Sequence, residues 1–208
     1  MEHSSLYVIF LVAIASFLGA LPFGLVNLNV IETTLRKSPK AGTMLSLGAT
    51  LLEMVHALIA IQCAMIITDS LDSNPYIKGA VLAVFFLLGL FFFFKRQASG
   101  DKPKRKLPFK VSDFGRGAFL SLINPQAIPF WLFIVTYFSS HQMLEVHPEV
   151  FPEFLIGVGI GKILALLVFV YFSLFIERRM GRVAQGMNKI IGSIFFLLAA
   201  LQAYQLWG

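Results

Sequence analysis

Glu53 and His56 lie three residues apart within an otherwise apolar segment of the chain. Residues at this spacing share one face of a helix. An ionisable side chain inside a bilayer is costly and usually faces a cavity, an ion pathway or a charged partner. The pair therefore predicts a proton-coupling or substrate-cation site in which Glu53 is the carboxylate. The alternative is a polar pair that only holds neighbouring helices together.

A third charged residue, Lys162, lies in another apolar segment, close to Gly157 and Gly161. Glycines four apart predict that this helix approaches another one closely. They do not form a phosphate loop, because that motif needs a Ser or Thr after the lysine and Ile163 follows here. We expect Lys162 to pair with Glu53 or to hold a substrate carboxylate; the alternative is that it snorkels to the membrane surface.

Proline interrupts two apolar segments, at Pro22 and at Asn124-Pro125, and Pro129 follows the second of these. Proline removes a backbone donor and collides with the preceding turn, so a helix must kink or part there. Within lipid, the freed backbone groups need partners inside the protein or in a water-filled cavity. Two interrupted helices at related positions in two halves indicate a transport site.

Side-chain amides flank both breaks. We expect them either to replace lost backbone partners or to bind the polar ends of a substrate. Trp131, just beyond the second break, is expected to fill space between helices; the alternative is that it closes a pocket. The predicted substrate or coupling site comprises Pro22, Gly24, Asn27, Glu53, His56, Asn124, Pro125, Gln126 and Lys162.

The elements that carry these residues are membrane spans. The chain is 57% hydrophobic and only 13% charged, whereas an ordinary soluble domain has about 25% charged residues. A transmembrane helix needs about 20 apolar residues. The sequence predicts an all-α integral membrane protein with six such helices, at residues 6–31, 42–67, 76–94, 115–139, 153–176 and 187–206.

The basic residues determine the expected orientation. The loops between spans 1 and 2, 3 and 4, and 5 and 6 contain 15 of the 17 Lys and Arg residues, counting their flanks. The positive-inside rule then places these loops in the cytoplasm and both termini outside the cell membrane. Orientation and anionic lipid account for the net charge of +6. We therefore expect no nucleic-acid partner.

Three spans in each half mean that the second half enters the membrane from the opposite side. We therefore expect a 3+3 inverted repeat in which the broken spans 1 and 4 are equivalent. Residues 1–208 would form a single membrane domain. Its first half is 1–94, its basic cytoplasmic loop is 95–113 and its second half is 114–208.

The sequence gives little support for catalysis or a bound cofactor. Cys63 is the only cysteine, so neither an intramolecular disulfide nor a zinc cluster can form. Glu-x-x-His resembles half of a di-iron carboxylate site, but a second copy is missing. No Ser/His/Asp arrangement or His-Glu-x-x-His motif is present. We expect no enzyme, no metal site and no cofactor.

The chain resembles the LysE/RhtB-type family of amino-acid exporters. The resemblance rests on Pro22-Phe23-Gly24, Gly48 with Glu53 and His56, Gly115-Arg116-Gly117 and Asn124-Pro125-Gln126-Ala127. The family typically has Pro-Gly-Pro and Asn-Pro-Lys where this chain has Phe23 and Gln126, and Lys162 is not part of its pattern. The resemblance implies a six-span transporter that exports amino acids or similar small metabolites, driven by the proton gradient.

The expected function is therefore a secondary transporter of the inner membrane that binds its substrate near mid-membrane, with Glu53 titrating during the cycle. Its partners would be a small amino acid-like molecule, protons and lipid, with a homo-oligomer as a further possibility. One alternative is a transporter of divalent metal ions, with Glu53, His56 and the amides as ligands. The other is a non-transporting membrane assembly protein.

Overall fold

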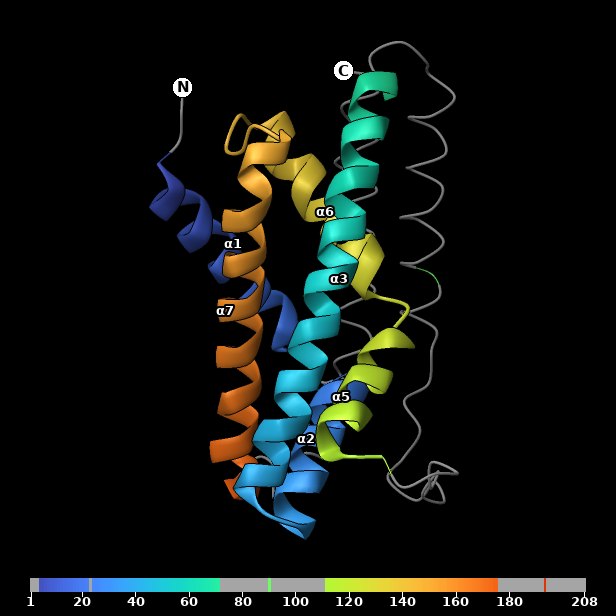
Figure 1. Cartoon of the computed structure of the whole chain (residues 1–208), viewed down its shortest axis with the longest axis vertical. Helices are drawn as coiled ribbons and strands as arrows, with labels where there is room; N and C mark the ends of the chain where they lie inside the picture. Colours follow the sequence, from blue (N-terminus) through green and yellow to red (C-terminus); the bar gives the residue numbers. More distant parts are fainter. Residues whose placement is uncertain (1–3, 23, 72–89, 91–110, 176–192, 194–208) are drawn as a thin grey trace. The chain divides into compact units, whose positions relative to one another are not determined.

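The structure is a computed structural model, and it describes residues 4–22, 24–71, 90, 111–175 and 193. These residues form helices and connecting turns, with no strand among them (Figure 1). The predicted spans at 76–94 and 187–206, and the basic loop up to residue 110, lie outside the described residues. The helices are α1 (Ser5–Ala20), α2 (Leu25–Arg36), α3 (Pro39–Leu71), α5 (Asp113–Leu122), α6 (Ala127–Ser140), the 3-10 turn η1 (Pro148–Val150) and α7 (Phe151–Tyr171).

Two helical segments are long and apolar enough to cross a membrane unaided, Pro39–Met65 and Pro148–Tyr171. Two bent pairs, α1 with α2 and α5 with α6, bring the number to four if each pair is one span. Their positions agree with four of the predicted spans. The chain is a multi-pass membrane protein, as predicted.

Both helix breaks lie where proline predicted them. The axes of α1 and α2 differ by 75°, and those of α5 and α6 by 66°. The second break occupies residues 123–126 and includes Pro125 but not Pro129, which lies in the first turn of α6. Pro129 does not interrupt that helix, because a first-turn residue has no intrahelical partner for its N–H.

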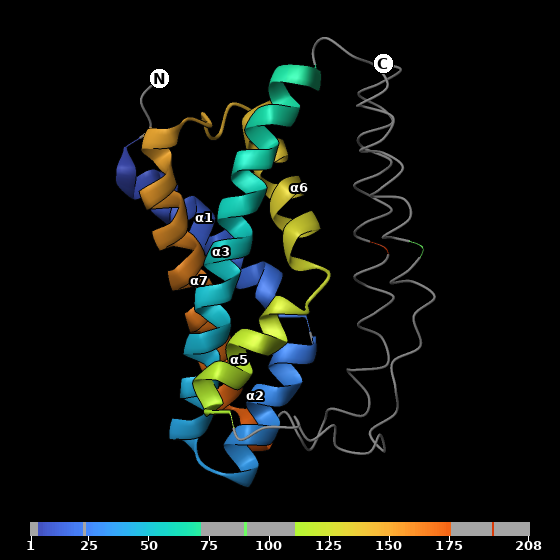
Figure 2. The same ribbon diagram turned by 45° about the vertical axis from the view of Figure 1, so that its right-hand side comes forward.

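Each half of the described fold consists of a broken helix followed by a long straight one, and the two halves run in opposite directions (Figure 1, Figure 2). At one end, Ser5 Oγ donates a hydrogen bond to Glu153 Oε1 over 3.0 Å, so the starts of α1 and α7 meet. At the other end, Lys37 forms an ion pair with Asp113, so α2 ends beside the start of α5. An inverted repeat has this arrangement. Its third helices lie outside the described residues, so the six-helix repeat stays a prediction.

The described helices belong almost entirely to one compact unit, formed by residues 1–66 and 108–178. Residues 67–107 and 179–208 form a second unit. Every contact discussed below lies within the first unit. This unit combines segments from both predicted halves of the chain.

Glycines allow two pairs of helices to touch through their backbones. A Cβ on Gly161 of α7 would collide with the backbone of α1 at Ala13 and Phe17, and one on Gly157 would reach Ile9. The predicted close approach of this helix is therefore confirmed, with α1 as the partner. A side chain would likewise be impossible without displacement at Gly48 of α3, which meets α5, or at Gly117 of α5, which meets α3.

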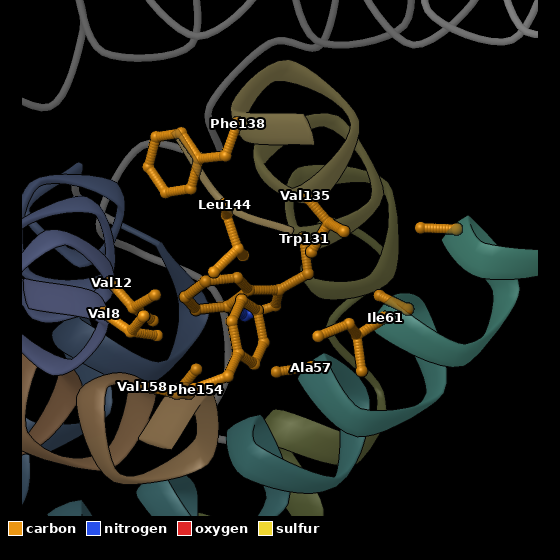
Figure 3. Close-up of a cluster of buried hydrophobic side chains, with 12 residues drawn as sticks. Val8, Val12, Ala57, Ile61, Trp131, Val135, Phe138, Leu144, Phe154 and Val158 are labelled. Atoms are coloured by element: carbon orange, nitrogen blue, oxygen red, sulfur yellow. The ribbon is translucent and has the colours of Figure 1, made fainter. Parts of the chain in front are cut away.

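A hydrophobic cluster fills the space between α1, α3, α6 and α7 in the half of the unit that contains the start of α1 (Figure 3). Trp131 lies among side chains from the other three helices and is fully buried. The buried members of the cluster are Val8, Val12, Ala57, Ala60, Ile61, Ala64, Trp131, Val135, Phe138, Leu144, Phe154 and Val158. These side chains fill the interior between the four helices in that half of the unit.

Candidate functional site

Glu53 and Lys162 form an ion pair between the middle of α3 and the middle of α7. Glu53 Oε2 lies 3.2 Å from Lys162 Nζ, and their side chains are only 7% and 8% exposed. Glu53 is near the centre of the span Pro39–Met65, and Lys162 is well inside the span Pro148–Tyr171. The expected pairing is found, and Lys162 does not snorkel.

Trp131 of α6 completes this group. Its indole Nε1–H donates a hydrogen bond to Glu53 Oε1 over 3.0 Å. The expectation that Trp131 only fills space was incomplete, since it also binds the buried carboxylate. A buried tryptophan needs an acceptor for its N–H, and this requirement was the available sequence signal. Its identity as a partner of Glu53 depended on how α3 and α6 pack.

The second carboxylate oxygen has a charge partner but an unused hydrogen-bonding position. Lys162 Nζ lies within ion-pair distance of Glu53 Oε2, yet its direction does not satisfy hydrogen-bond geometry, and no other described group donates to that oxygen. A carboxylate oxygen can accept more than one hydrogen bond, so Oε2 can also accept one from a ligand.

Aromatic rings connect the ion pair to both helix breaks. The Trp131 ring makes edge-to-face contacts with Phe130 and Phe154, with centroids 5.1 and 5.5 Å apart. The Phe130 ring in turn occupies the space above Gly19, in the last turn of α1. The end of α1 and the start of α6 therefore meet beside Trp131. Because Trp131 binds Glu53, a movement at either break would change the surroundings of Glu53.

His56 follows Glu53 by one turn on α3 and is buried. Its Nδ1 has no hydrogen-bond partner among the described residues. The structure therefore places His56 near the ion pair on the same helix without joining the two by a contact. This ring nitrogen can donate or accept a hydrogen bond, depending on the tautomer of the imidazole.

The amides of Asn27 and Asn124 are used to close the broken helices. Asn27 Nδ2 donates hydrogen bonds to the carbonyl oxygens of Ala20 and Pro22, each over 2.7 Å. Asn124 Oδ1 accepts a hydrogen bond from the backbone N–H of Gln126 over 3.3 Å. In this geometry, both residues have the first of the two expected roles, which is to replace backbone partners lost at the breaks.

The remaining predicted site residues shape the breaks. Gly24 is the extended residue that precedes α2, and Gln126 precedes α6. Pro125 is exposed. The Gln126 side chain is half-buried and makes no hydrogen bond with any described residue. No described contact joins these residues or Pro22 to Glu53 or Lys162. They lie at the two helix breaks.

Replacing Asn27 by leucine is expected to lower the stability of the folded protein by about 1–3 kcal/mol, because it leaves a buried carbonyl oxygen, that of Ala20, and a partly buried one, that of Pro22, without this donor. Thermal unfolding of the purified protein in detergent would measure this change. Asn29→Leu is a matched control, since Asn29 bonds Arg116 and Leu25 on a more open surface. Equal losses in the two variants would contradict a special role for Asn27.

A metal site finds no support in the part of the chain that the structure describes. No group of three or more His, Cys, Asp and Glu side chains lies close enough there to hold an ion. The amides that the metal hypothesis needed as ligands are engaged with the backbone at Asn27 and Asn124.

Comparison with known families agrees with the membrane architecture. The family model described as LysE type translocator matches residues 17–206. This range includes both helix breaks and the group formed by Glu53, Trp131 and Lys162. No curated protein and no solved structure matches the chain.

Proposed function

Because the chain belongs to the LysE type translocator family, we propose that it is a secondary transporter that exports amino acids or similar metabolites across the cytoplasmic membrane, driven by protons. Family membership makes the protein a membrane transporter of small molecules rather than a member of an enzyme family. The observation that carries the finer proposal is the buried Glu53–Lys162 ion pair in the middle of two spans. Intramembrane charges of this kind mark substrate and ion pathways.

In the proposed mechanism, substrate binds near mid-membrane, at the ion pair and between the two broken helices. The hydrophobic cluster around Trp131 lies on the side on which α1 and α7 begin, and in this proposal it separates the site from that side. Basic residues at the opposite end, among them Arg36, Lys37 and Lys40, favour the cytoplasm for that end. Both termini would then lie outside, and the structure would be closed toward the exterior.

Protonation of Glu53 supplies the coupling. The carboxylate binds either a proton or a cationic group, because neutralisation removes its attraction for both Lys162 and a substrate ammonium. The breaks between α1 and α2 and between α5 and α6 allow the halves of the two broken helices to change their angles while Asn27 and Asn124 hold the backbone ends. A proton taken up on one side and released on the other therefore returns the site to its starting charge.

Proteoliposomes that contain a mixture of the twenty protein amino acids test the coupling. An imposed pH gradient is expected to drive net movement of at least one of them in the native protein, whereas Glu53→Gln is expected to lower gradient-driven movement by roughly 100-fold. Glu32→Gln is the matched control, because Glu32 is an exposed acid paired with Arg36 at the end of α2. Movement that ignores the gradient and is unchanged in Glu53→Gln would overturn the mechanism.

A further inference from the structure

The buried charges of the candidate site sum to zero. Glu53 contributes a negative charge and Lys162 a positive one, and their charged atoms are 3.2 Å apart. Among the described residues, these two and His56 are the only buried acidic or basic side chains. Each of the two side chains is less than a tenth exposed to solvent, so water compensates little of either charge. Any cargo that enters the site must therefore preserve this balance or leave a charge uncompensated.

We infer that Lys162 is a specificity-determining residue that excludes cargo with a net positive charge and favours zwitterions with one ammonium and one carboxylate group. The inference rests on the proposed function, since it takes the Glu53–Lys162 pair as the transport site. It assigns to Lys162 a role in selecting cargo by charge, in addition to its role as the partner of Glu53.

A cationic molecule is excluded because Lys162 already occupies the position that the cation needs. To bind Glu53, it must displace the Lys162 ammonium, which then remains buried without a carboxylate. An unpaired charge in this environment is strongly unfavourable. If the cation binds beside Lys162 instead, two positive charges share one carboxylate. Both arrangements weaken binding relative to a cargo whose own charges cancel.

A zwitterion can enter between the two charged groups without changing their sum. Its ammonium can donate to Glu53 Oε2, the oxygen that lacks a hydrogen-bond donor among the described residues. Its carboxylate can accept from Lys162, which has three donor hydrogens. Trp131 holds the other carboxylate oxygen of Glu53 throughout. One ion pair becomes two, and the net charge of the site stays at zero.

The test measures the efflux of all twenty amino acids from proteoliposomes that contain the full chain, with protein-free vesicles as the background. No pH gradient is imposed, so that selectivity is separated from coupling. The native protein is expected to release zwitterionic amino acids roughly tenfold or more faster than lysine and arginine. Lys162→Gln is expected to reduce this preference by roughly tenfold, because the Glu53 carboxylate then accepts a cation freely.

Three further variants make the result specific to the charge pair. Lys162→Arg keeps the charge and should keep the preference for zwitterions. Glu53→Gln leaves Lys162 as the single charge and should shift release toward glutamate and aspartate, which provides a second test should Lys162→Gln not fold. Lys37→Gln removes a positive charge from the exposed end of α2 and should leave the preference unchanged.

Release of lysine and arginine by the native protein at the rate of the zwitterions would overturn the inference. A preference that is the same in Lys162→Gln, or in Glu53→Gln if only that variant folds, would do so too. Both results would leave the proposed function standing, because amino acids would still move. If no amino acid left vesicles containing the native protein, the proposed export of amino acids would fail, and the inference with it.

Discussion

Replacing Gly117 by valine is expected to lower the stability of the folded protein by about 3 kcal/mol or more. A Cβ at this position would overlap the carbonyl group of Leu45 and come within 3.1 Å of the backbone nitrogen of Ala49. A helix backbone cannot move aside as a flexible side chain can, so α5 would have to separate from α3. The yield of monodisperse protein and its unfolding temperature in detergent would measure the loss.

Gly24→Ala is the matched control for this prediction. Gly24 lies in the first helix break, its φ of −107° suits any residue, and the nearest atom to an added Cβ is 3.9 Å away. Alanine at this position should therefore be tolerated, with an unfolding temperature close to the native value. If Gly117→Val were as stable as Gly24→Ala, the close backbone contact between α3 and α5 would not exist in the membrane.

Replacing Lys162 by methionine is expected to destabilise the protein by about 3–5 kcal/mol, because the Glu53 carboxylate stays buried without its counter-charge. The double variant Glu53→Gln/Lys162→Met should recover most of this loss, since neither charge remains and the glutamine can still accept the Trp131 hydrogen bond. Thermal unfolding of the four proteins, from native to double variant, gives the coupling between the two residues.

Additive losses in this cycle would contradict a direct ion pair, because independent residues do not compensate for each other. The stability cycle and the efflux measurements address different properties of the same two side chains. A stable double variant that no longer selects its cargo would show that the pair is retained for selectivity rather than for folding.

The helix breaks and the close helix contacts could be predicted because their causes are local. Pro22 and Pro125 disrupt a helix wherever it lies, and a pair of glycines four residues apart makes one face of a helix flat. The partner of Gly157 and Gly161 could not be predicted in the same way. It depends on α1 and α7 lying side by side, and their contact residues are more than 140 positions apart in the chain.

The site was harder to predict than the spans. The charges of Glu53 and Lys162 identified two of its members, because a charge inside an apolar segment requires a partner. The hydrogen bond from Trp131 to Glu53 was not predicted. An aromatic residue in an apolar segment can have several partners, and its partner depends on how α6 packs on α3. For Asn27, the sequence left open a backbone or a substrate role. The structure favours the backbone role, because two carbonyl oxygens at and just after the end of α1 accept hydrogen bonds from the Asn27 amide.

The glycine contacts have a mechanical consequence for the transport cycle. Backbone contact joins α1 to α7 and α3 to α5, and each such pair should move as a rigid block. Between the blocks, α3 and α7 are in contact through a flexible side chain, that of Met54, which lies against Gly159. Glu53 belongs to the block of α3 and α5, and Lys162 belongs to the block of α1 and α7. Their ion pair therefore links the two blocks electrostatically. Neutralising either charge would remove this electrostatic link between the two blocks.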